Sequence, residues 1–196
     1  MRIHIIGNKG VVGGATSRLF KELGHEVTGH DVKEGTLKQA GIYFVCVPED
    51  EVRGVLASLR GKVPPGSTVV VRSTVTPGIF PEFAHISHVP ESLREASSIV
   101  DEFNPPMIMI GECCQEHGQI IESLYRPLCV PIIRTDPITS CMVKLATNGY
   151  LSCVISYWNE IERLCKEVGT TGHKVGMIAS MDPRVSSYGS RFNQKF

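Results

Sequence analysis

The sequence has little of what would place it in a specialised class of protein. Its 196 residues include 20 basic and 20 acidic side chains and one tryptophan. A net charge of zero argues against a nucleic-acid-binding protein, which usually carries a broad basic face. No run approaches the ~18 consecutive apolar residues of a membrane span, and MRIHIIG at the amino terminus lacks the layout of a signal peptide. We therefore expect a cytoplasmic protein with neither a nucleic-acid nor a membrane partner.

Paired cysteine motifs are also missing. The odd number of cysteines, the absence of a C-x-x-C motif and the absence of Cys/His ligand spacing argue against a disulfide framework and against a metal site. Since 42% of the residues are hydrophobic, a chain of this length can bury roughly 70% of its unfolded surface without either device. We expect the cysteines to be reduced, mostly buried thiols: Cys46, Cys113, Cys114, Cys129, Cys141, Cys153 and Cys165.

Apolar strand patterns alternate with helical patterns through residues 1–134. Strands are expected at 3–6, 26–30, 42–47, 68–72, 86–89, 107–110 and 130–134, and helices at 15–23, 49–59 and 114–125. Unbroken apolar strands between amphipathic helices are typical of a sheet covered on both faces. The predicted fold class is α/β, with a Rossmann-type, doubly wound, mostly parallel sheet forming a first domain over residues 1–134.

Residues 135–196 follow a different pattern. Asp136 and Pro137 form a helix start, and Gly169 is a natural end, which predicts a helix over 137–168 of about 32 residues, on the order of 48 Å long. It is either a long surface helix or, as its aromatic and apolar side chains favour, a strut that packs against a second domain or subunit. A short helical segment at 174–180 follows.

A glycine loop joins the first strand to the first helix. Gly7, Gly10 and Gly13 have the sequence G-N-K-G-V-V-G, one residue longer in the first gap than the usual G-x-G-x-x-G. Such glycines allow a tight turn, a close approach of pyrophosphate to backbone amides, and contact between helix and strand. The predicted cofactor contacts in this loop are Gly7, Lys9, Gly10, Val11, Val12 and Gly13.

Asp31 ends the second strand, 24 residues after Gly7. At that place a carboxylate can accept both hydroxyls of an adenosine ribose and would repel a 2'-phosphate. The segment HDVKEG offers no arginine to a phosphate. The sequence therefore favours NAD over NADP as the cofactor.

Three further segments resemble the UDP-glucose/GDP-mannose dehydrogenase family. Residues 73–78, S-T-V-T-P-G, are similar to its S-T-V-x-P-G motif. Residues 90–96, P-E-S-L-R-E-A, resemble P-E-F-L-R-E-G, with Ser92 and Ala96 as departures. Lys144 and Asn148, the N-E-I at 159–161 and the D-P-R at 182–184 match K-x-x-x-N, N-E-I and D-x-R. These motifs cover nearly the whole chain.

The resemblance implies an NAD-dependent enzyme that oxidises the C6 hydroxyl of a nucleotide sugar to a carboxylate, and a homodimer formed through helix 137–168. Lys144 and Asn148 lie four apart and so share one helix face, where an ammonium and an amide can stabilise an oxyanion. Asp182 is a weaker candidate for the site. The catalytic residues implied are Thr74, Glu91, Glu95, Lys144 and Asn148; cofactor contacts beyond the glycine loop are Val47, Pro48, Ser73, Thr74 and Glu91.

One departure affects the expected activity. Family members carry a nucleophilic cysteine in a G-G-x-C motif after D-x-R, and a further domain for the nucleotide, whereas this sequence ends at Phe196. We therefore expect a shortened chain that does not complete the four-electron oxidation alone, because trapping the aldehyde needs that thiolate. Two alternatives stay open: an NAD-dependent dehydrogenase of the 3-hydroxyacid type, and a non-catalytic module that binds NAD and dimerises.

Overall fold

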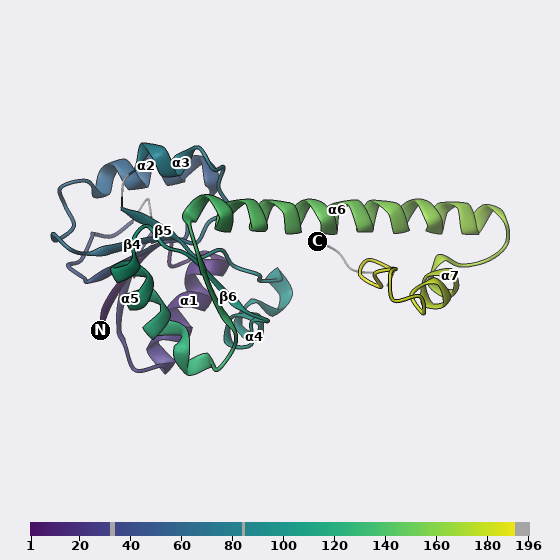
Figure 1. Ribbon diagram of the computed structural model, residues 1–196, viewed down its shortest axis with the longest axis horizontal. Helices are drawn as coiled ribbons and strands as arrows, with labels where there is room; N and C mark the ends of the chain where they lie inside the picture. The colour runs from purple at the N-terminus through teal and green to yellow at the C-terminus, as the bar shows by residue number, and fades with distance from the viewer. Residues whose placement is uncertain (32–33, 84, 191–196) are drawn as a thin grey trace. The chain divides into compact units, whose positions relative to one another are not determined.

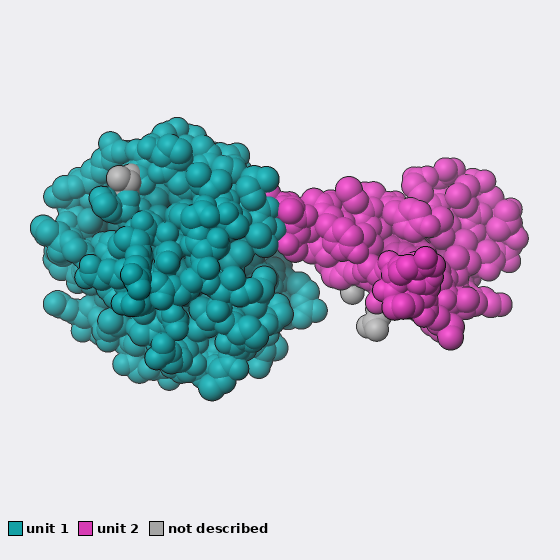
Figure 2. All heavy atoms as spheres, viewed as in Figure 1, with its two compact units in different colours: residues 1–143 teal, residues 144–196 magenta. Residues whose placement is uncertain are grey.

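The computed structural model of the protein describes residues 1–31, 34–83 and 85–190. By internal packing the chain divides into unit 1, residues 1–143, and unit 2, residues 144–196 (Figure 2). The first turns of the long helix belong to unit 1, so this division falls nine residues beyond the domain boundary expected at residue 134. The expected boundary stays a prediction.

Unit 1 is built on a seven-stranded sheet with the order β2-β1-β3-β4-β5-β6-β7. Strands β1 to β5 pair in parallel, β5 pairs antiparallel with β6, and β6 pairs in parallel with β7. The mostly parallel, doubly wound sheet is confirmed; the reversal between β5 and β6 was not foreseen. The strands are β1 (Arg2–Ile6), β2 (Glu26–His30), β3 (Ile42–Val45), β4 (Thr68–Val71), β5 (Ile86–His88), β6 (Ile108–Gly111) and β7 (Ile132–Thr135).

Helices cover both faces of this sheet. Helices α1 (Val11–Glu22), α4 (Ser98–Phe103) and α5 (Gln115–Tyr125) lie on one face, and α2 (Glu49–Leu59) with the short α3 (Ile79–Glu82) on the other (Figure 1). Two 3-10 turns, η1 (Glu95–Ser97) and η2 (Arg126–Leu128), complete the unit. The apolar strands predict this arrangement, since β1, β3 and β4 are buried almost throughout.

A buried ion pair joins four elements beneath the sheet. Arg72, just after β4, donates through both terminal nitrogens to the Glu102 carboxylate of α4, at 2.7 and 3.0 Å. Arg72 also donates to the Tyr125 hydroxyl of α5, and the Thr16 hydroxyl of α1 donates to Glu102. Both charged side chains are at most 4% exposed. Because every partner sits on a different element, the network fixes α1, which carries the glycine loop, against the end of β4.

Helix α6 (Pro137–Glu167) confirms the predicted long helix. The Asp136 carboxylate accepts from the Thr139 backbone N–H at 2.9 Å and from its hydroxyl at 2.6 Å, as an N-cap does. In unit 2 a second helix, α7 (Gly172–Ala179), follows, and its Gly172 N–H donates to the Glu162 carboxylate of α6 at 2.7 Å. Trp158 is buried at 2% exposure.

Helix α6 is long and apolar enough to cross a membrane by length and composition. An 18-residue window reaches a mean hydropathy of 1.2, and only 11% of that window is buried. The expectation that the chain has no membrane span rested on the lack of a long, unbroken apolar run. It did not take account of this helix, because polar residues separate its apolar ones. The helix still carries the charged side chains Lys144, Glu160, Glu162, Arg163, Lys166 and Glu167.

The expectation of buried cysteines holds for only part of the set. Cys46, Cys141 and Cys165 are buried, as predicted. Cys114, Cys129 and Cys153 are exposed, and Cys113 is half-buried, so the prediction was wrong for these positions. The reason is local: Cys114 is the N-cap of α5 and Cys129 ends η2 in a left-handed conformation, both of which face solvent.

Candidate dinucleotide-binding site

The glycine loop packs so closely that two of its positions admit no side chain. Gly7 has a φ of +84°, and a Cβ there would lie 2.2 Å from the Cys46 carbonyl oxygen. A Cβ at Gly13 would lie 2.1 Å from the Gly7 carbonyl oxygen. The Gly7 N–H donates to the His30 carbonyl of β2 at 2.8 Å. The first and third glycines therefore set the turn and the contact between helix and strand.

Gly10 differs from the other two glycines. It is the N-cap of α1, and a Cβ there would meet only the Gly7 carbonyl oxygen, at 3.4 Å. Among the residues that the structure describes, no side chain caps α1, so the amides of its first turn keep the free donors of a helix start. A bare N-cap and unpaired amides at the start of a 12-residue helix suit an anion, because the helix dipole adds to the amide donors.

Asp31 lies directly after β2, at the corner next to the loop. Its backbone exchanges hydrogen bonds with Glu34, each at 3.1 Å. The Glu34 carboxylate is paired with the Lys9 ammonium, and this hydrogen bond raises the pKa of Lys9 and lowers the pKa of Glu34. Lys9 is thus held by a carboxylate, and its predicted contact with a phosphate stays a prediction.

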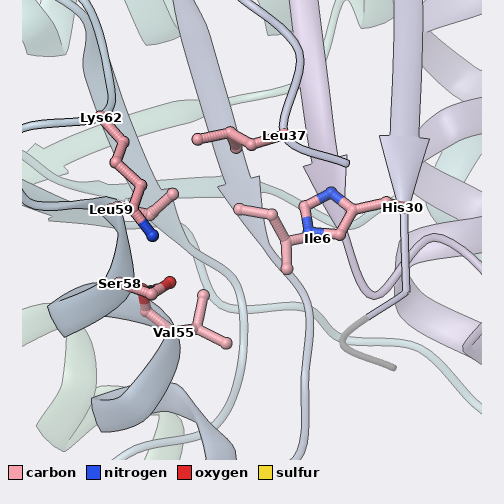
Figure 3. A pocket seen from close by; sticks show the side chains of 7 residues that line it. All are labelled: Ile6, His30, Leu37, Val55, Ser58, Leu59 and Lys62. Atoms are coloured by element: carbon pink, nitrogen blue, oxygen red, sulfur yellow. Dashed lines mark hydrogen bonds between the residues drawn. The ribbon is translucent and has the colours of Figure 1, made fainter. Parts of the chain in front are cut away.

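A half-open cavity of about 220 Å³ lies next to this corner. Figure 3 shows His30 and Ile6 on one side of it, facing side chains of α2 and Lys62 on the other. Because His30 immediately precedes Asp31, the cavity adjoins the proposed ribose position. Its lining consists of Ile6, His30, Leu37, Val55, Ser58, Leu59 and Lys62.

His30, which lines that cavity, forms a hydrogen-bonded pair with a second histidine, His4. The His4 Nε2 and His30 Nδ1 atoms lie 2.7 Å apart, and His4 Nδ1 lies 2.7 Å from the Thr28 hydroxyl. Burial lowers the pKa of His4 to about 4, and burial also lowers the pKa of His30. Both rings are therefore neutral at pH 7. Sequence reasoning missed the pair, although strand alternation places all three side chains on one face once the β1–β2 register is known.

The ends of β3 and β4 are fastened to each other. The Ser73 hydroxyl donates to the Val47 carbonyl at 2.6 Å and accepts from the Val47 N–H at 3.2 Å. Pro48 follows as the N-cap of α2, and Thr74 is partly exposed beside this link. The structure therefore brings these four predicted cofactor contacts together at the carboxyl edge of the parallel strands, where ligands bind in open α/β sheets.

The segment after β5 carries two of the predicted catalytic carboxylates. Glu91 accepts from the Leu93 backbone N–H at 2.6 Å, while Glu95 is exposed at the start of η1. Arg94 donates through its side chain and backbone to Asp101, and these hydrogen bonds keep the pKa of the Asp101 carboxyl well below its usual range. The Arg94–Asp101 pair thus fixes the turn between the two glutamates.

Buried side chains tie the first turn of α6 to the S-T-V-T-P-G segment within unit 1. His88 of β5 lies 3.0 Å from the Ser140 hydroxyl and 3.3 Å from the Ser73 carbonyl. The Cys141 thiol donates to the Val75 carbonyl at 2.9 Å. Sequence reasoning assigned no role to these side chains, because nothing in their spacing links residues 52 to 66 positions apart.

Lys144 and Asn148 belong to unit 2. They lie one turn apart on α6, Lys144 half-buried and Asn148 exposed, with the Asn148 carbonyl accepting from the Ser152 hydroxyl. The sharing of one helix face is as expected. Lys144 and Asn148 belong to unit 2, whereas the carboxyl edge of the sheet belongs to unit 1. A joint catalytic role of the two therefore stays a prediction.

A glycine cradle between β1 and α1, an acidic side chain at the end of the neighbouring strand and a mostly parallel sheet define the class of Rossmann-type α/β proteins. Comparison with known proteins narrows this class. Residues 139–194 match the UDP-glucose/GDP-mannose dehydrogenase family, central domain. The chain belongs to the UDP-glucose/GDP-mannose dehydrogenase family.

The sequence is similar to curated relatives in the same family. It is 32% identical to UDP-glucose 6-dehydrogenase YwqF of Bacillus subtilis over 136 residues, covering 69% of this chain and 31% of that protein. It is 35% identical to the GDP-mannose 6-dehydrogenase of Pseudomonas savastanoi over 166 residues, covering 76% of this chain and 36% of that protein. The chain thus spans about a third of the length of these relatives.

A solved structure extends the likeness to the fold. A ternary complex of GDP-mannose dehydrogenase from Pseudomonas aeruginosa superposes with a TM-score of 0.79 at 26% identity, covering 99% of this chain and 59% of the other. Both units therefore have counterparts in that dehydrogenase.

A second family description, Mur ligase family, catalytic domain, matches residues 2–105. That range holds the glycine loop and the elements of unit 1 from β1 to α4. A phosphate loop of the form G-x-x-x-x-G-K-[ST] does not occur in the sequence, since Gly61-Lys62 is followed by Val63. The family assignment rests on the match of residues 139–194 and on the curated relatives.

Proposed function

We propose that the chain binds NAD and forms the NAD-binding and central helical part of a nucleotide-sugar 6-dehydrogenase, which oxidises the C6 hydroxyl of UDP-glucose, GDP-mannose or a related nucleotide sugar to a carboxylate in the cytoplasm. The observation that carries the proposal is the glycine cradle, in which Gly7 and Gly13 leave no space for a side chain while Gly10 leaves the start of α1 bare.

The residues of this site fit a dinucleotide. The amides of Val11, Val12 and Gly13 would donate to the pyrophosphate, and the Asp31 carboxylate would accept from the adenosine ribose. The half-open cavity beside His30 would take the flat adenine ring between apolar side chains. Val47, Pro48, Ser73 and Thr74 would hold the nicotinamide end at the carboxyl edge of β3 and β4.

The same corner favours NAD over NADP. The 2'-phosphate of NADP would meet the Asp31 carboxylate, and the backbone bridge from Asp31 brings a second carboxylate, Glu34, to this corner. Glu34 also neutralises Lys9, a cation that could otherwise attract a phosphate. The unpaired like charge that opposes binding of the dianion is therefore that of the Asp31 carboxylate.

When bound, NAD accepts a hydride from the carbon that is oxidised. In the complete enzyme, we assign Thr74 and Glu91 to the ordering of water near the nicotinamide, with Glu95 as a further carboxylate. Lys144 and Asn148 would stabilise negative charge on the substrate oxygen through an ammonium and an amide donor. The motif matches at these positions support the assignments.

We further propose a homodimer through α6. Tyr150, Tyr157 and Leu164 recur every seventh residue and are 54%, 57% and 47% exposed. A stripe with this period is typical of a helix that packs along another helix. The low burial of this apolar helix is explained if a second copy covers it, and the same exposure makes a lipid bilayer the competing partner that an experiment must exclude.

Calorimetric titration of the glycine variants with NAD tests the cofactor proposal. Gly10→Ala should keep the free energy of unfolding within about 1 kcal/mol of the parent chain, since its Cβ meets one atom at ordinary distance, yet weaken NAD binding where phosphate approaches. Gly13→Ala should lose both stability and binding. Gly54→Ala, in α2, is the matched control, because a Cβ there would meet nothing within 4 Å. It should lower neither the free energy of unfolding nor the affinity for NAD.

The proposal fails if the parent chain gives no heat with NAD, or if Gly10→Ala binds NAD as tightly as the parent chain does.

A further inference from the structure

Two thiols and an imidazole meet where β6 passes into α5. Cys113 and Cys114 are consecutive, and His117 lies one turn into the helix, giving the sequence C-C-Q-E-H. The Cys113 Sγ and His117 Nδ1 atoms lie 3.1 Å apart. The ligand atoms of all three side chains lie within 4.8 Å of one another. None of these residues takes part in the dinucleotide site.

Those separations suit a tetrahedral ion. With Zn–S bonds of about 2.3 Å and Zn–N bonds of about 2.0 Å, two ligands on one zinc ion lie roughly 3.5–3.8 Å apart. The separations in the cluster, from 3.1 Å between Cys113 and His117 up to at most 4.8 Å, bracket these values. Three protein ligands leave a fourth position for water, and the exposure of Cys114 keeps that position open to solvent.

Neighbouring groups support the ligands. The Ser87 hydroxyl of β5 lies 3.5 Å from the Cys113 sulfur, as a donor, and accepts from the Cys113 N–H at 3.3 Å. A hydroxyl that donates to a bound thiolate is a common second partner of metal ligands. Cys114 is the N-cap of α5 and so lies at the start of the helix that carries His117.

The cluster lies apart from the carboxyl edge that carries the glycine loop. Because β6 runs antiparallel to β5, the chain after Gly111 turns back toward the amino end of β5, and Cys113 contacts Ser87 there. An ion at this place would be neither a ligand of the dinucleotide nor a group in the dehydrogenase reaction.

We propose that Cys113, Cys114 and His117 form a site for one thiophilic divalent ion of the zinc class, with water in the fourth position. Binding releases the thiol protons to solvent and leaves the ion in an S₂N set of ligands, which softer divalent ions prefer over magnesium or calcium. The sequence did not predict this site, because C-C-x-x-H matches none of the usual spacings of zinc ligands.

Titration of the full chain with Co²⁺ under a non-thiol reductant tests the proposal. We expect one equivalent to give a thiolate-to-cobalt charge-transfer band and the visible bands of a tetrahedral ion, and Zn²⁺ to displace it. Cys114→Ser and His117→Ala should each weaken binding at least tenfold. Cys129→Ser, at another exposed cysteine of unit 1, is the matched control and should bind as the parent chain does.

A second measurement keeps the test independent of the stability of the variants. In the parent chain, Zn²⁺ should slow alkylation of Cys113 and Cys114 at least tenfold, while alkylation of Cys129 proceeds at an unchanged rate. The proposal is overturned if the cobalt bands persist in Cys113→Ser/Cys114→Ser, if they never form in the parent chain, or if Zn²⁺ protects none of these thiols. NAD affinity should be the same with and without Zn²⁺, so failure here leaves the dinucleotide proposal untouched.

Discussion

The two units bury their apolar side chains to different extents. In unit 1, strands such as β3 and β4 are buried along their whole length by helices of the same unit. In unit 2, Trp158 is buried, whereas Tyr150, Tyr157 and Leu164 on α6 and Met177 and Ile178 on α7 stay exposed. Unit 1 therefore buries a core of its own, and unit 2 exposes the apolar surface on which the proposed dimer rests.

This difference separates two kinds of stability. Side chains that are buried within unit 1 should set the free energy of unfolding regardless of protein concentration. The exposed stripe on α6 should act through association, so that its contribution depends on concentration. Substitutions in the two units test this distinction.

The largest effect is expected at the buried ion pair of unit 1. Glu102→Ala leaves the Arg72 guanidinium buried without its carboxylate, which should lower the free energy of unfolding by about 3–5 kcal/mol. Glu160→Ala, which removes an exposed ion pair with Arg163 on α6, should change it by less than about 1 kcal/mol. Denaturant titration measures both. Equal effects would contradict the contrast, and Arg72→Met/Glu102→Leu should recover most of the loss.

The next effect is a dependence on pH that originates at His4. The unfolded chain takes up a proton on His4 near pH 6.5, whereas burial keeps the folded ring neutral until about pH 4. Acidification through this window therefore favours the unfolded state, by up to about 3 kcal/mol. His4→Gln should flatten the fall in the free energy of unfolding between pH 6.5 and 4. Identical profiles for variant and parent would rule out this role.

A smaller effect is expected from a charge in the stripe on α6. Tyr157→Glu should weaken self-association at least tenfold, about 1.4 kcal/mol, in sedimentation equilibrium, while the fold of unit 1 is kept. Ser156→Glu places the same charge at the neighbouring exposed position and is the control, with a smaller expected loss. A parent chain that stays monomeric at every concentration, or that sediments with lipid vesicles, would contradict the proposed dimer.

The smallest effect concerns the start of α6. Asp136→Ala removes the side chain that caps this helix through Thr139 and should lower the free energy of unfolding by about 1 kcal/mol. Asp136→Asn keeps an oxygen acceptor and should recover most of the loss. A cost of more than about 3 kcal/mol would show that Asp136 does more than cap the helix.

Local patterns in the sequence predict most of the fold. The apolar strands, the glycine loop and the capped start of α6 each follow from neighbouring residues, and the structure confirms these elements. The reversal between β5 and β6 could not be predicted, because a single pair of residues, His88 and Gly111, carries it. The exposure of Cys114 follows from its place as an N-cap, which composition does not reveal.

The same distinction holds for the candidate site: local spacing predicts some of its residues, and only the fold brings the others together. Gly7, Gly13 and Asp31 could be found because their spacing along the chain is itself the signal. The pairing of His4 with His30, and of Arg72 with Glu102, joins residues 26 and 30 positions apart, which only the strand order brings into contact. The place of Glu34, which neutralises Lys9, likewise depends on its backbone pairing with Asp31.

Discrimination between NAD and NADP is the decisive test of the proposed cofactor site, because it depends on the Asp31 carboxylate at the end of β2. Calorimetric titration of the full chain should show NAD binding at least tenfold more tightly than NADP, and Asp31→Ala should narrow this ratio by weakening NAD binding. Equal affinity for the two dinucleotides, tighter binding of NADP, or an unchanged NAD affinity in Asp31→Ala would contradict the assignment of this corner as the ribose site.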